Sequence, residues 1–343
     1  MPAPIFIVGA NRSGTTLLRL LLNAHSAVAI PDEINYFYGF DWTVSYHNWR
    51  TPSLSPDAYE AFVDRFLAAN APNVPGLDGP ALREKILSRP ANLRRPYRLL
   101  LQGWADLHDK ARWGEKTPGN IYHADLLRDM FPDALFVHVV RDPRGGVASM
   151  NRVSFFPDDA VLNALNRHKV MTHGRAFLHR SIPSRQRTEV RYEDLVSAPR
   201  ETLRRLCRFL DLPYEDQMLR FHVDAERFMT EAASSSFNAA ATTPITREHA
   251  GRWRTDLSAD EIASVELLCA REMAEFDYPR LHPPLSWRGL ANLLLKWSYW
   301  RLQWWRHRRD RHFAVVTPML FQSRARLRRL ARWVSGRLAR TGS

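Results

Sequence analysis

The sequence IFIVGANRSGTTLLRLLL, residues 5–22, decides the fold of this chain. Ile5–Val8 is a continuous apolar run, which is typical of a strand buried on both faces. Gly9–Thr16 is a polar, glycine-containing turn, and the leucines that follow it predict a helix that ends near Asn23. Because a turn in this position gathers backbone N–H groups at the positive end of the helix dipole, the stretch predicts an anion site.

Strands and helices alternate along the rest of the chain. The sequence predicts further strands at Ala27–Ile30, Ala134–Val140 and Thr188–Tyr192. Helices are predicted at Pro199–Leu210, where proline occupies an early helical position, and from the capping box that begins at Ser258 to about residue 276. This alternation indicates βαβ units, and therefore an α/β fold with a central, mostly parallel sheet.

A neutral body and a basic tail divide the chain at about residue 285. The tail, residues 286–343, contains 14 Lys/Arg residues and a single acid, Asp310, so it carries the whole net charge of +13. The body, residues 1–285, is neutral overall, and the high isoelectric point therefore says nothing about its partners. Within the body, residues 35–92 contain aromatics, prolines and two helical patches, which predicts a helical insertion over a sheet edge.

The tail combines tryptophan with arginine on predicted amphipathic helices. Residues 327–338 form one apolar stripe among arginines, and an earlier stripe consists of Leu290, Leu293, Leu294, Trp297, Trp300 and Trp304. Basic amphipathic helices with tryptophan usually lie in the headgroup region of anionic membranes, so we expect the tail to bind such a surface. Intramolecular packing of the tryptophan stripe on the body is the alternative. Nucleic acid is disfavoured, because the aromatics share a helix face and do not alternate for base stacking.

Cysteine content and the N-terminus limit the classes of protein further. Cys207 and Cys269 cannot form a disulfide framework, and both lie in helical patterns, which favours buried free thiols in a reducing compartment. The N-terminus lacks the basic and apolar segments of a signal peptide. No run reaches the roughly 18 apolar residues that a membrane span needs. We therefore expect a cytoplasmic protein that is either soluble or peripheral at a membrane.

The cation inside the predicted anion loop is an arginine. The loop has the Gly-x-x-x-x-Gly spacing of a Walker A motif, but Thr15 occupies the position of the loop lysine and Arg12 lies inside the loop. A kinase-like phosphotransferase would need that lysine, and would use Asp142 as a magnesium ligand. A tight strand–helix turn capped by Ser13 or Thr15 is the structural alternative.

At these residues the chain resembles the sulfotransferases that use 3′-phosphoadenosine 5′-phosphosulfate (PAPS), particularly the branch of the protein-tyrosine sulfotransferases and related bacterial enzymes. That branch opens with a strand, the motif Arg-Ser-Gly-Thr-Thr, a leucine-rich helix and an acidic pair, all of which occur here within residues 5–33. The resemblance extends from Pro4 to about Phe276 and implies a three-layer P-loop-like fold. It also implies that the donor's 5′-phosphosulfate is held by Arg12, Ser13, Gly14, Thr15 and Thr16.

A second anion site is predicted where the strand Ala134–Val140 ends. Arg141 lies at its carboxyl end and Ser149 in the helix that follows, so both can face the crevice in which open parallel sheets bind ligands. The resemblance implies that this pair binds the donor's 3′-phosphate, and that Tyr192 and Arg252 complete the nucleotide site. A turn ion pair is the alternative for Arg141, and simple packing is the alternative for Tyr192.

Sulfuryl transfer to a hydroxyl group requires a base for the acceptor proton. Glu33 is the candidate, because it follows the second short strand at the mouth of the predicted crevice. It also lies 21 residues after Arg12, a spacing similar to that of the catalytic glutamate in the tyrosine sulfotransferase branch. Asp32 and Glu115 are its competitors.

The reaction also needs positive charge on the transferring group. The resemblance assigns this role to Lys116, in a short motif after the strand-like Ala111–Trp113, and places Ser236 near the leaving phosphate. A solvated loop lysine is the structural alternative for Lys116.

The predicted partners follow from this chemistry. PAPS is the co-substrate, and no metal is required, because a sulfuryl group carries less charge than a phosphoryl group. The acceptor bears a hydroxyl group, on a carbohydrate, a lipid-linked alcohol, a tyrosine or a small metabolite, and residues 35–92 are expected to shape its pocket. A kinase-like enzyme and a non-catalytic nucleotide-binding membrane protein are the alternative functions.

Overall fold

The computed structural model describes all residues except 1, 35, 38–53, 229–242 and 308–343. The chain divides into two compact units. The first unit consists of Met1–Arg141 and Gly174–Glu248, and the second of Asp142–His173 and His249–Ser343. Each unit is described by itself below.

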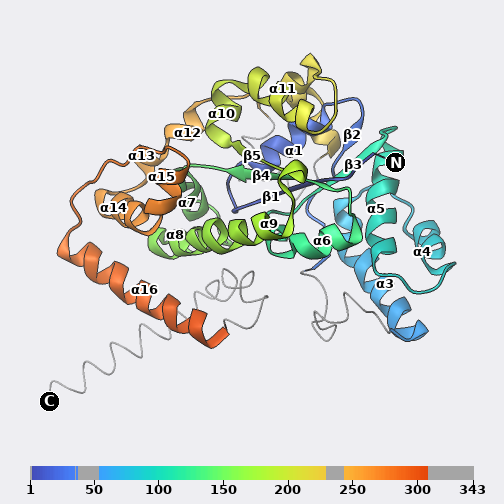
Figure 1. The fold of residues 1–343 in the computed structure, drawn as a ribbon, viewed down its shortest axis with the longest axis horizontal. Helices are drawn as coiled ribbons and strands as arrows, with labels where there is room; N and C mark the ends of the chain where they lie inside the picture. The colour runs from blue at the N-terminus through green and yellow to red at the C-terminus, as the bar shows by residue number, and fades with distance from the viewer. Residues whose placement is uncertain (1, 35, 38–53, 229–242, 308–343) are drawn as a thin grey trace. The chain divides into compact units, whose positions relative to one another are not determined.

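A five-stranded parallel sheet forms the centre of the first unit (Figure 1). The strand order is β2-β3-β1-β4-β5, and every pairing between neighbours is parallel. The strands are β1 (Ile5–Gly9), β2 (Val28–Ala29), β3 (Arg112–Lys116), β4 (Leu135–Val140) and β5 (Arg187–Arg191). The predicted α/β class and parallel sheet are confirmed. One strand end differs: the sequence predicted that the third strand stops before the motif containing Lys116, whereas β3 runs through that residue.

Helices cover both faces of this sheet, as a parallel sheet requires. In Figure 1, α1 (Thr15–Asn23), α10 (Tyr192–Ser197) and α11 (Pro199–Phe209) lie above the sheet, and α6 (Ala124–Met130) and α9 (Arg175–Ser181) lie below it. This is the three-layer arrangement that the sequence predicts. Short 3₁₀ helices complete the first unit: η1 (Ala71–Asn73), η2 (Pro118–His123), η4 (Ser184–Gln186), η5 (Asp216–Val223) and η6 (Ala225–Phe228).

The lower face of the sheet is packed with aromatic rings around Phe6. Its ring centroid lies 5.4 Å from that of Phe136 on β4, 6.1 Å from Trp113 on β3 and 6.4 Å from Tyr97. Tyr97 belongs to α5 (Arg94–Leu107), which therefore lies on the same face as Phe6. Burial of several large rings at one point contributes on the order of 2 kcal/mol per side chain and fixes the register of β1 against its neighbours.

The predicted insertion contains the two expected helices where the structure describes it. These are α3 (Pro56–Asn70) and α4 (Gly79–Leu87), which begin after the capping side chains of Ser55 and Asp78. Asn35 and residues 38–53 lie outside the described residues. The sequence did not predict α5, whose first turn is basic and so lacks the acidic residues that are typical of a helix start.

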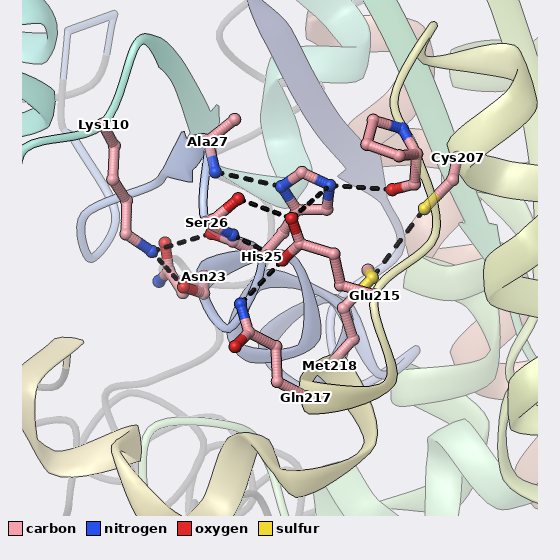
Figure 2. Close-up of polar contacts among 10 residues, drawn as sticks. Asn23, His25, Ser26, Ala27, Lys110, Cys207, Glu215, Gln217 and Met218 are labelled. Carbon is pink, nitrogen blue, oxygen red and sulfur yellow. Dashed lines mark hydrogen bonds and ion pairs between the residues drawn. The ribbon is translucent and has the colours of Figure 1, made fainter.

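A polar network anchors β2 at the edge of the sheet (Figure 2). The carboxylate of Glu215 accepts hydrogen bonds from the backbone N–H of Ser26, at 2.8 Å, and from its hydroxyl group, at 2.5 Å. His25 Nε2 lies 2.8 Å from the Pro213 carbonyl oxygen, and Lys110 Nζ donates to the carbonyl oxygens of Asn23 and His25. These contacts hold the turn between α1 and β2, and therefore fix where the chain leaves β2 toward Glu33.

All the regular elements in the described residues of the second unit are helices. Its elements are α7 (Pro143–Asn151), α8 (Ala160–Lys169), the π-helix η3 (Val170–Gly174), α12 (Glu248–Gly251), α13 (Trp253–Asp256), α14 (Ala259–Leu268), α15 (Ala270–Glu275) and α16 (Trp287–His307); the last residue of η3 and the first of α12 belong to the first unit. The predicted capping box is present: Ser258 Oγ accepts from the Glu261 N–H, and Glu261 accepts from the Ser258 N–H. The predicted single helix is broken at Cys269 into α14 and α15. Both cysteines are buried free thiols, as predicted.

A buried guanidinium organises the second unit. Arg144 donates to Asp142 through Nε and Nη2 and to Glu266 through Nη1, at 2.7 Å. The same guanidinium lies 3.9 Å from the ring centroid of Trp253. Glu266 also accepts 2.9 Å hydrogen bonds from two backbone N–H groups at residues 281 and 282. A buried charge with this many partners is satisfied, so it holds α7 and α14 together without an uncompensated desolvation cost.

The first part of the tail is the helix α16, and it packs within the second unit. Leu293 and Trp300 are buried against Val161 and Leu165 of α8. The predicted single apolar stripe therefore divides: Leu293 and Trp300 are packed inside, while Leu290, Leu294 and Trp297 are exposed. The second predicted stripe, residues 327–338, lies outside the described residues.

Candidate functional site

The loop between β1 and α1 leaves the first turn of the helix without a side-chain cap. Gly14 is the N-cap residue, with φ +93°, and the first turn of α1 contains no acidic side chain. Arg12 also has a positive φ, 62°. A helix of nine residues whose first N–H groups have no side-chain acceptor provides donors and a positive dipole end for a bound anion.

Ser13 adds a buried polar atom to this loop. Its side chain is completely buried, and Ser13 Oγ has no hydrogen-bond partner among the described residues. An orphaned buried hydroxyl costs about 1–3 kcal/mol unless something binds it. This oxygen, the loop N–H groups and the Arg12 side chain are a donor set that fits a phosphate or phosphosulfate group.

Arg141 and Tyr192 lie against the same loop. Arg141 Nη1 donates to the carbonyl oxygen of Arg12 at 3.1 Å, and its guanidinium carbon lies 4.2 Å from the ring centroid of Tyr192. Tyr192 in turn covers Gly14, where a Cβ atom would lie only 2.4 Å from the ring atom Cδ2. The structure therefore brings together Arg12, Gly14, Arg141 and Tyr192, four residues predicted from three separate segments of the sequence.

Lys116 and Glu33 form an ion pair at the carboxyl end of β3. Lys116 Nζ lies 2.5 Å from Glu33 Oε1. The lysine side chain is 4% exposed, whereas the glutamate side chain is 47% exposed and so remains accessible from solvent. Asn73 Nδ2 donates to the Glu33 carbonyl oxygen at 2.9 Å, which fixes the backbone of this residue from η1. No local sequence pattern predicts this contact, because the two residues are 40 positions apart.

Asp32, the first competitor for the role of base, is held in an ion pair. Asp32 Oδ1 lies 2.7 Å from Arg19 Nη2, and the Arg19 side chain is completely buried. Arg19 also donates to the Phe228 carbonyl oxygen at 2.7 Å. The acidic pair Asp32–Glu33 is therefore divided: the first carboxylate is paired in the interior, and the second is half-exposed to solvent.

Glu115, the second competitor, is buried on the opposite side of β3 from Lys116, because neighbouring side chains of a strand alternate between faces. Its carboxylate accepts hydrogen bonds from the Thr117 hydroxyl and, at 2.8 Å, from Asn120 Nδ2. Burial raises the pKa of Glu115 to about 7, although these two hydrogen bonds oppose the increase. If the sequence prediction had extended the third strand through Lys116, the alternation of side chains would have placed Glu115 and Lys116 on opposite faces of the sheet.

The roles of three other predicted site residues stay predictions. Ser149 is buried in α7, and Arg252 is exposed just before α13; both belong to the second unit. Trp253, beside Arg252, is a core residue of that unit. Ser236 lies outside the described residues. The remaining predicted residues, Thr15 and Thr16, form the first turn of α1.

A sequence profile described as the sulfotransferase family matches residues 4–216, which is more than half of the chain. The chain belongs to the sulfotransferase family. This confirms the resemblance to PAPS-dependent sulfotransferases that the sequence motifs indicate, and the matched region contains the loop, Glu33, Lys116, Arg141 and Tyr192.

Several individual sulfotransferases are similar to the chain. Protein-tyrosine sulfotransferase A of Caenorhabditis elegans is 24% identical over 293 residues, which cover 82% of this chain and 68% of that protein. The omega-hydroxy-beta-dihydromenaquinone-9 sulfotransferase of Mycobacterium bovis is 25% identical over 253 residues, with 61% and 63% of the two chains covered. An uncharacterized protein of Aquifex aeolicus is 25% identical, but the matched region covers only 27% of its length.

Solved sulfotransferase domains share the fold. The domain of the Synechococcus PCC 7002 olefin synthase superposes with a TM-score of 0.56 at 20% identity, covering 81% of this chain and 97% of that domain. The domain of the curacin biosynthetic pathway gives a TM-score of 0.54 at 20% identity, with 81% and 99% covered. At this identity the likeness supports the sulfotransferase fold alone.

The contact between Gly14 and Tyr192 predicts a strong effect of Gly14→Ala. The added methyl group would meet the Tyr192 ring in a backbone conformation that L residues rarely adopt, so we expect the free energy of unfolding to fall by about 1–3 kcal/mol. We expect nucleotide affinity to fall by about tenfold or more, because Tyr192 supports Arg141. Thermal unfolding and calorimetric titration check both effects. Gly79→Ala is the matched control, since nothing lies within 4 Å of its Cβ position; equal behaviour of the two variants would contradict the argument.

The raised pKa of Glu115 predicts a pH-dependent stability. Between about 4.5, the ordinary value, and about 7, the folded protein binds a proton that the unfolded chain releases, so the stability present below this window is lost as pH rises through it. Glu115→Gln removes this titrating group. Measured by urea unfolding, the free energy of unfolding of the wild type is expected to fall by about 2–3 kcal/mol more than that of the variant between pH 5 and 8.

The matched control for that slope is Glu201→Gln, which changes a glutamate whose side chain is 74% exposed. We expect the free energy of unfolding of Glu201→Gln to vary with pH as it does in the wild type. A slope that is the same in wild type and Glu115→Gln would show that the buried carboxyl does not titrate in this window.

Proposed function

We propose that this protein transfers the sulfuryl group of PAPS to a hydroxyl-bearing acceptor, with Glu33 as the base. The observation that carries the proposal is the ion pair between Lys116 and Glu33, which places an accessible carboxylate and a buried ammonium group 2.5 Å apart. A base and a cation in contact are the two groups that the transfer needs at the reacting atoms.

The proposed donor site is the loop between β1 and α1. Ser13, Gly14, Thr15 and Thr16 would hold the 5′-phosphosulfate through N–H groups and hydroxyls, with Arg12 as the neutralising cation. Arg141, supported by the Tyr192 ring, would bind a phosphate of the nucleotide. Roles for Ser149, Arg252 and Ser236 stay predictions that rest on motif spacing alone.

The proposed reaction balances without a metal ion. Glu33 takes the proton of the acceptor hydroxyl while the oxygen of that hydroxyl attacks the sulfur atom of PAPS. The bond between sulfur and the bridging phosphate oxygen breaks, and adenosine 3′,5′-bisphosphate leaves with the electron pair. Lys116 stays beside the reacting group and compensates the negative charge that develops on its oxygens, a contribution that electrostatic preorganisation makes large.

Among the alternative bases, Glu33 is favoured by accessibility. Asp32 is neutralised by the buried Arg19, and Glu115 is enclosed by Thr117 and Asn120. A carboxylate must come within hydrogen-bond reach of the acceptor hydroxyl to accept its proton. Of the three, Glu33 alone has a side chain that is about half-exposed; the other two are buried.

The kinase-like alternative is disfavoured by the residues that it would use. Thr15 stands at the position of the loop lysine. Asp142, the magnesium ligand of that alternative, accepts hydrogen bonds from both the backbone N–H and the guanidinium of Arg144. A carboxylate engaged in this way is unsuited to binding a metal ion.

The acceptor class stays open within hydroxyl compounds. Similar proteins carry names that specify tyrosine, carbohydrate and a hydroxylated menaquinone as acceptors. We therefore propose the same four classes for a screen with labelled PAPS: a carbohydrate, a lipid-linked alcohol, a tyrosine peptide and a small metabolite.

Nucleotide binding separates sulfuryl from phosphoryl transfer. We expect adenosine 3′,5′-bisphosphate to bind in calorimetric titration without magnesium, and Arg141→Lys to weaken binding by about tenfold or more, because lysine cannot stack on Tyr192 or bind bidentately. Arg83→Lys, a change in an exposed arginine paired with Asp64 and Glu60, is the matched control. Binding selective for ATP and dependent on magnesium would refute the proposal.

Substitution of the base tests the catalytic role of Glu33. Glu33→Gln keeps the size of the side chain but cannot take a proton, so we expect kcat with the acceptor found in the screen to fall by about 10²–10⁴-fold. Affinity for adenosine 3′,5′-bisphosphate is expected to change little. Glu60→Gln, at an exposed glutamate of α3, serves as control. Wild-type turnover by Glu33→Gln would show that another group is the base.

A further inference from the structure

The helix α16 is fixed on one side and open on the other. Leu293 and Trp300 are buried against α8, and Lys296 forms an ion pair with Asp159, the residue that caps α8. These contacts orient the helix within the second unit, so its opposite side faces away from α8.

The side of α16 opposite these contacts is apolar, which the sequence alone did not indicate. Residues 287, 294 and 305 are separated by 7 and 11 positions, close to whole numbers of helical turns, and so lie on one line along the helix. Trp287 is 75% exposed and Trp305 64%. We define the outward face of α16 as Trp287, Leu294, Leu295, Leu302 and Trp305.

Exposed apolar side chains are concentrated on this helix. Of 13 large hydrophobic side chains exposed in the described part of the chain, 8 belong to α16. Single exposed apolar residues are normal on a protein surface, whereas a contiguous patch of this kind marks an interaction site. The helix is not a membrane span, since none of the described helices is long and apolar enough to cross a bilayer.

The charges around the outward face identify the chemistry of its partner. The sequence of α16 contains Arg288, Lys296, Arg301 and Arg306 and no acidic residue. Two of these cations lie over tryptophan rings: Arg288 is 5.2 Å from the Trp287 centroid and Arg301 is 5.5 Å from the Trp297 centroid. The following residues, 308–343, add ten basic residues and one acid. The partner must therefore combine an apolar interior with negative charge at its surface.

We propose that α16 is a docking helix for the surface of an anionic lipid bilayer. Its outward face would enter the interface between headgroups and acyl chains, where tryptophan is favoured, while its arginines contact the lipid phosphates and carboxylates. A second copy of this chain is a poor partner, because self-association would bring two strongly positive segments together. This inference is independent of the sulfuryl-transfer chemistry.

Vesicle binding by the full chain tests the proposal. We expect the protein to sediment with vesicles of phosphatidylcholine containing about 30% phosphatidylserine, and to bind phosphatidylcholine vesicles at least about tenfold more weakly. The variant Trp287→Gln/Leu295→Gln/Trp305→Gln keeps every charge, and we expect its vesicle partition coefficient to fall on the order of 100-fold.

The matched control changes exposed apolar residues elsewhere: Leu107→Gln/Val223→Gln/Leu281→Gln. This variant is expected to bind vesicles as the wild type does, and both triple variants are expected to retain binding of adenosine 3′,5′-bisphosphate, which shows that they fold. Three results would overturn the proposal. The full chain could fail to bind the anionic vesicles, the outward-face variant could bind them unchanged, or the outward face could instead mediate a dimer that the triple variant abolishes.

Discussion

Parallel pairing of β1 with β3 on one side and with β4 on the other is the constraint on which the candidate site depends. Because all three strands run in one direction, their carboxyl ends lie at the same end of the sheet. The loop that contains Arg12 follows β1, Lys116 ends β3, and Arg141 follows β4. The aromatic contacts around Phe6 fix the relative register of these strands, and so a core interaction on the lower face determines where three cations stand.

The cations at this end of the sheet differ in how deeply their carboxylate partners are buried. Arg19 and Asp32 form an ion pair in which both side chains are buried. Removing one partner would leave the other charge buried and uncompensated, so this pair stabilises the fold. Lys116 is equally buried but faces a partner that is half in solvent. The pair of Lys116 and Glu33 can therefore open toward a ligand at a lower cost in free energy than the pair of Arg19 and Asp32.

Local sequence patterns predicted the main strands and helices and the loop between β1 and α1. The features that they did not predict depend on contacts between residues far apart in the sequence. Gly14 and Arg12 were identifiable because a strand, a glycine-containing turn and a helix follow each other within 18 residues. The end of β3 was misplaced because Gly114, Glu115 and Lys116 are not typical strand residues. They are held extended by pairing with β1, which no local pattern reveals. Likewise, helical periodicity placed Leu293 and Trp300 on one face of α16, but it could not show that α8 covers them.

The two edges of the sheet have a consequence for how copies of this protein meet. An edge strand with unpaired N–H and C=O groups is a template on which another chain can add a strand and begin to aggregate. Here β2 contributes only two residues, and the turn before it is tied down by Glu215 and Lys110. At the other edge, β5 alternates Arg187, Glu189 and Arg191. A sheet that ends in a very short strand on one side and a charged strand on the other resists growth by strand addition.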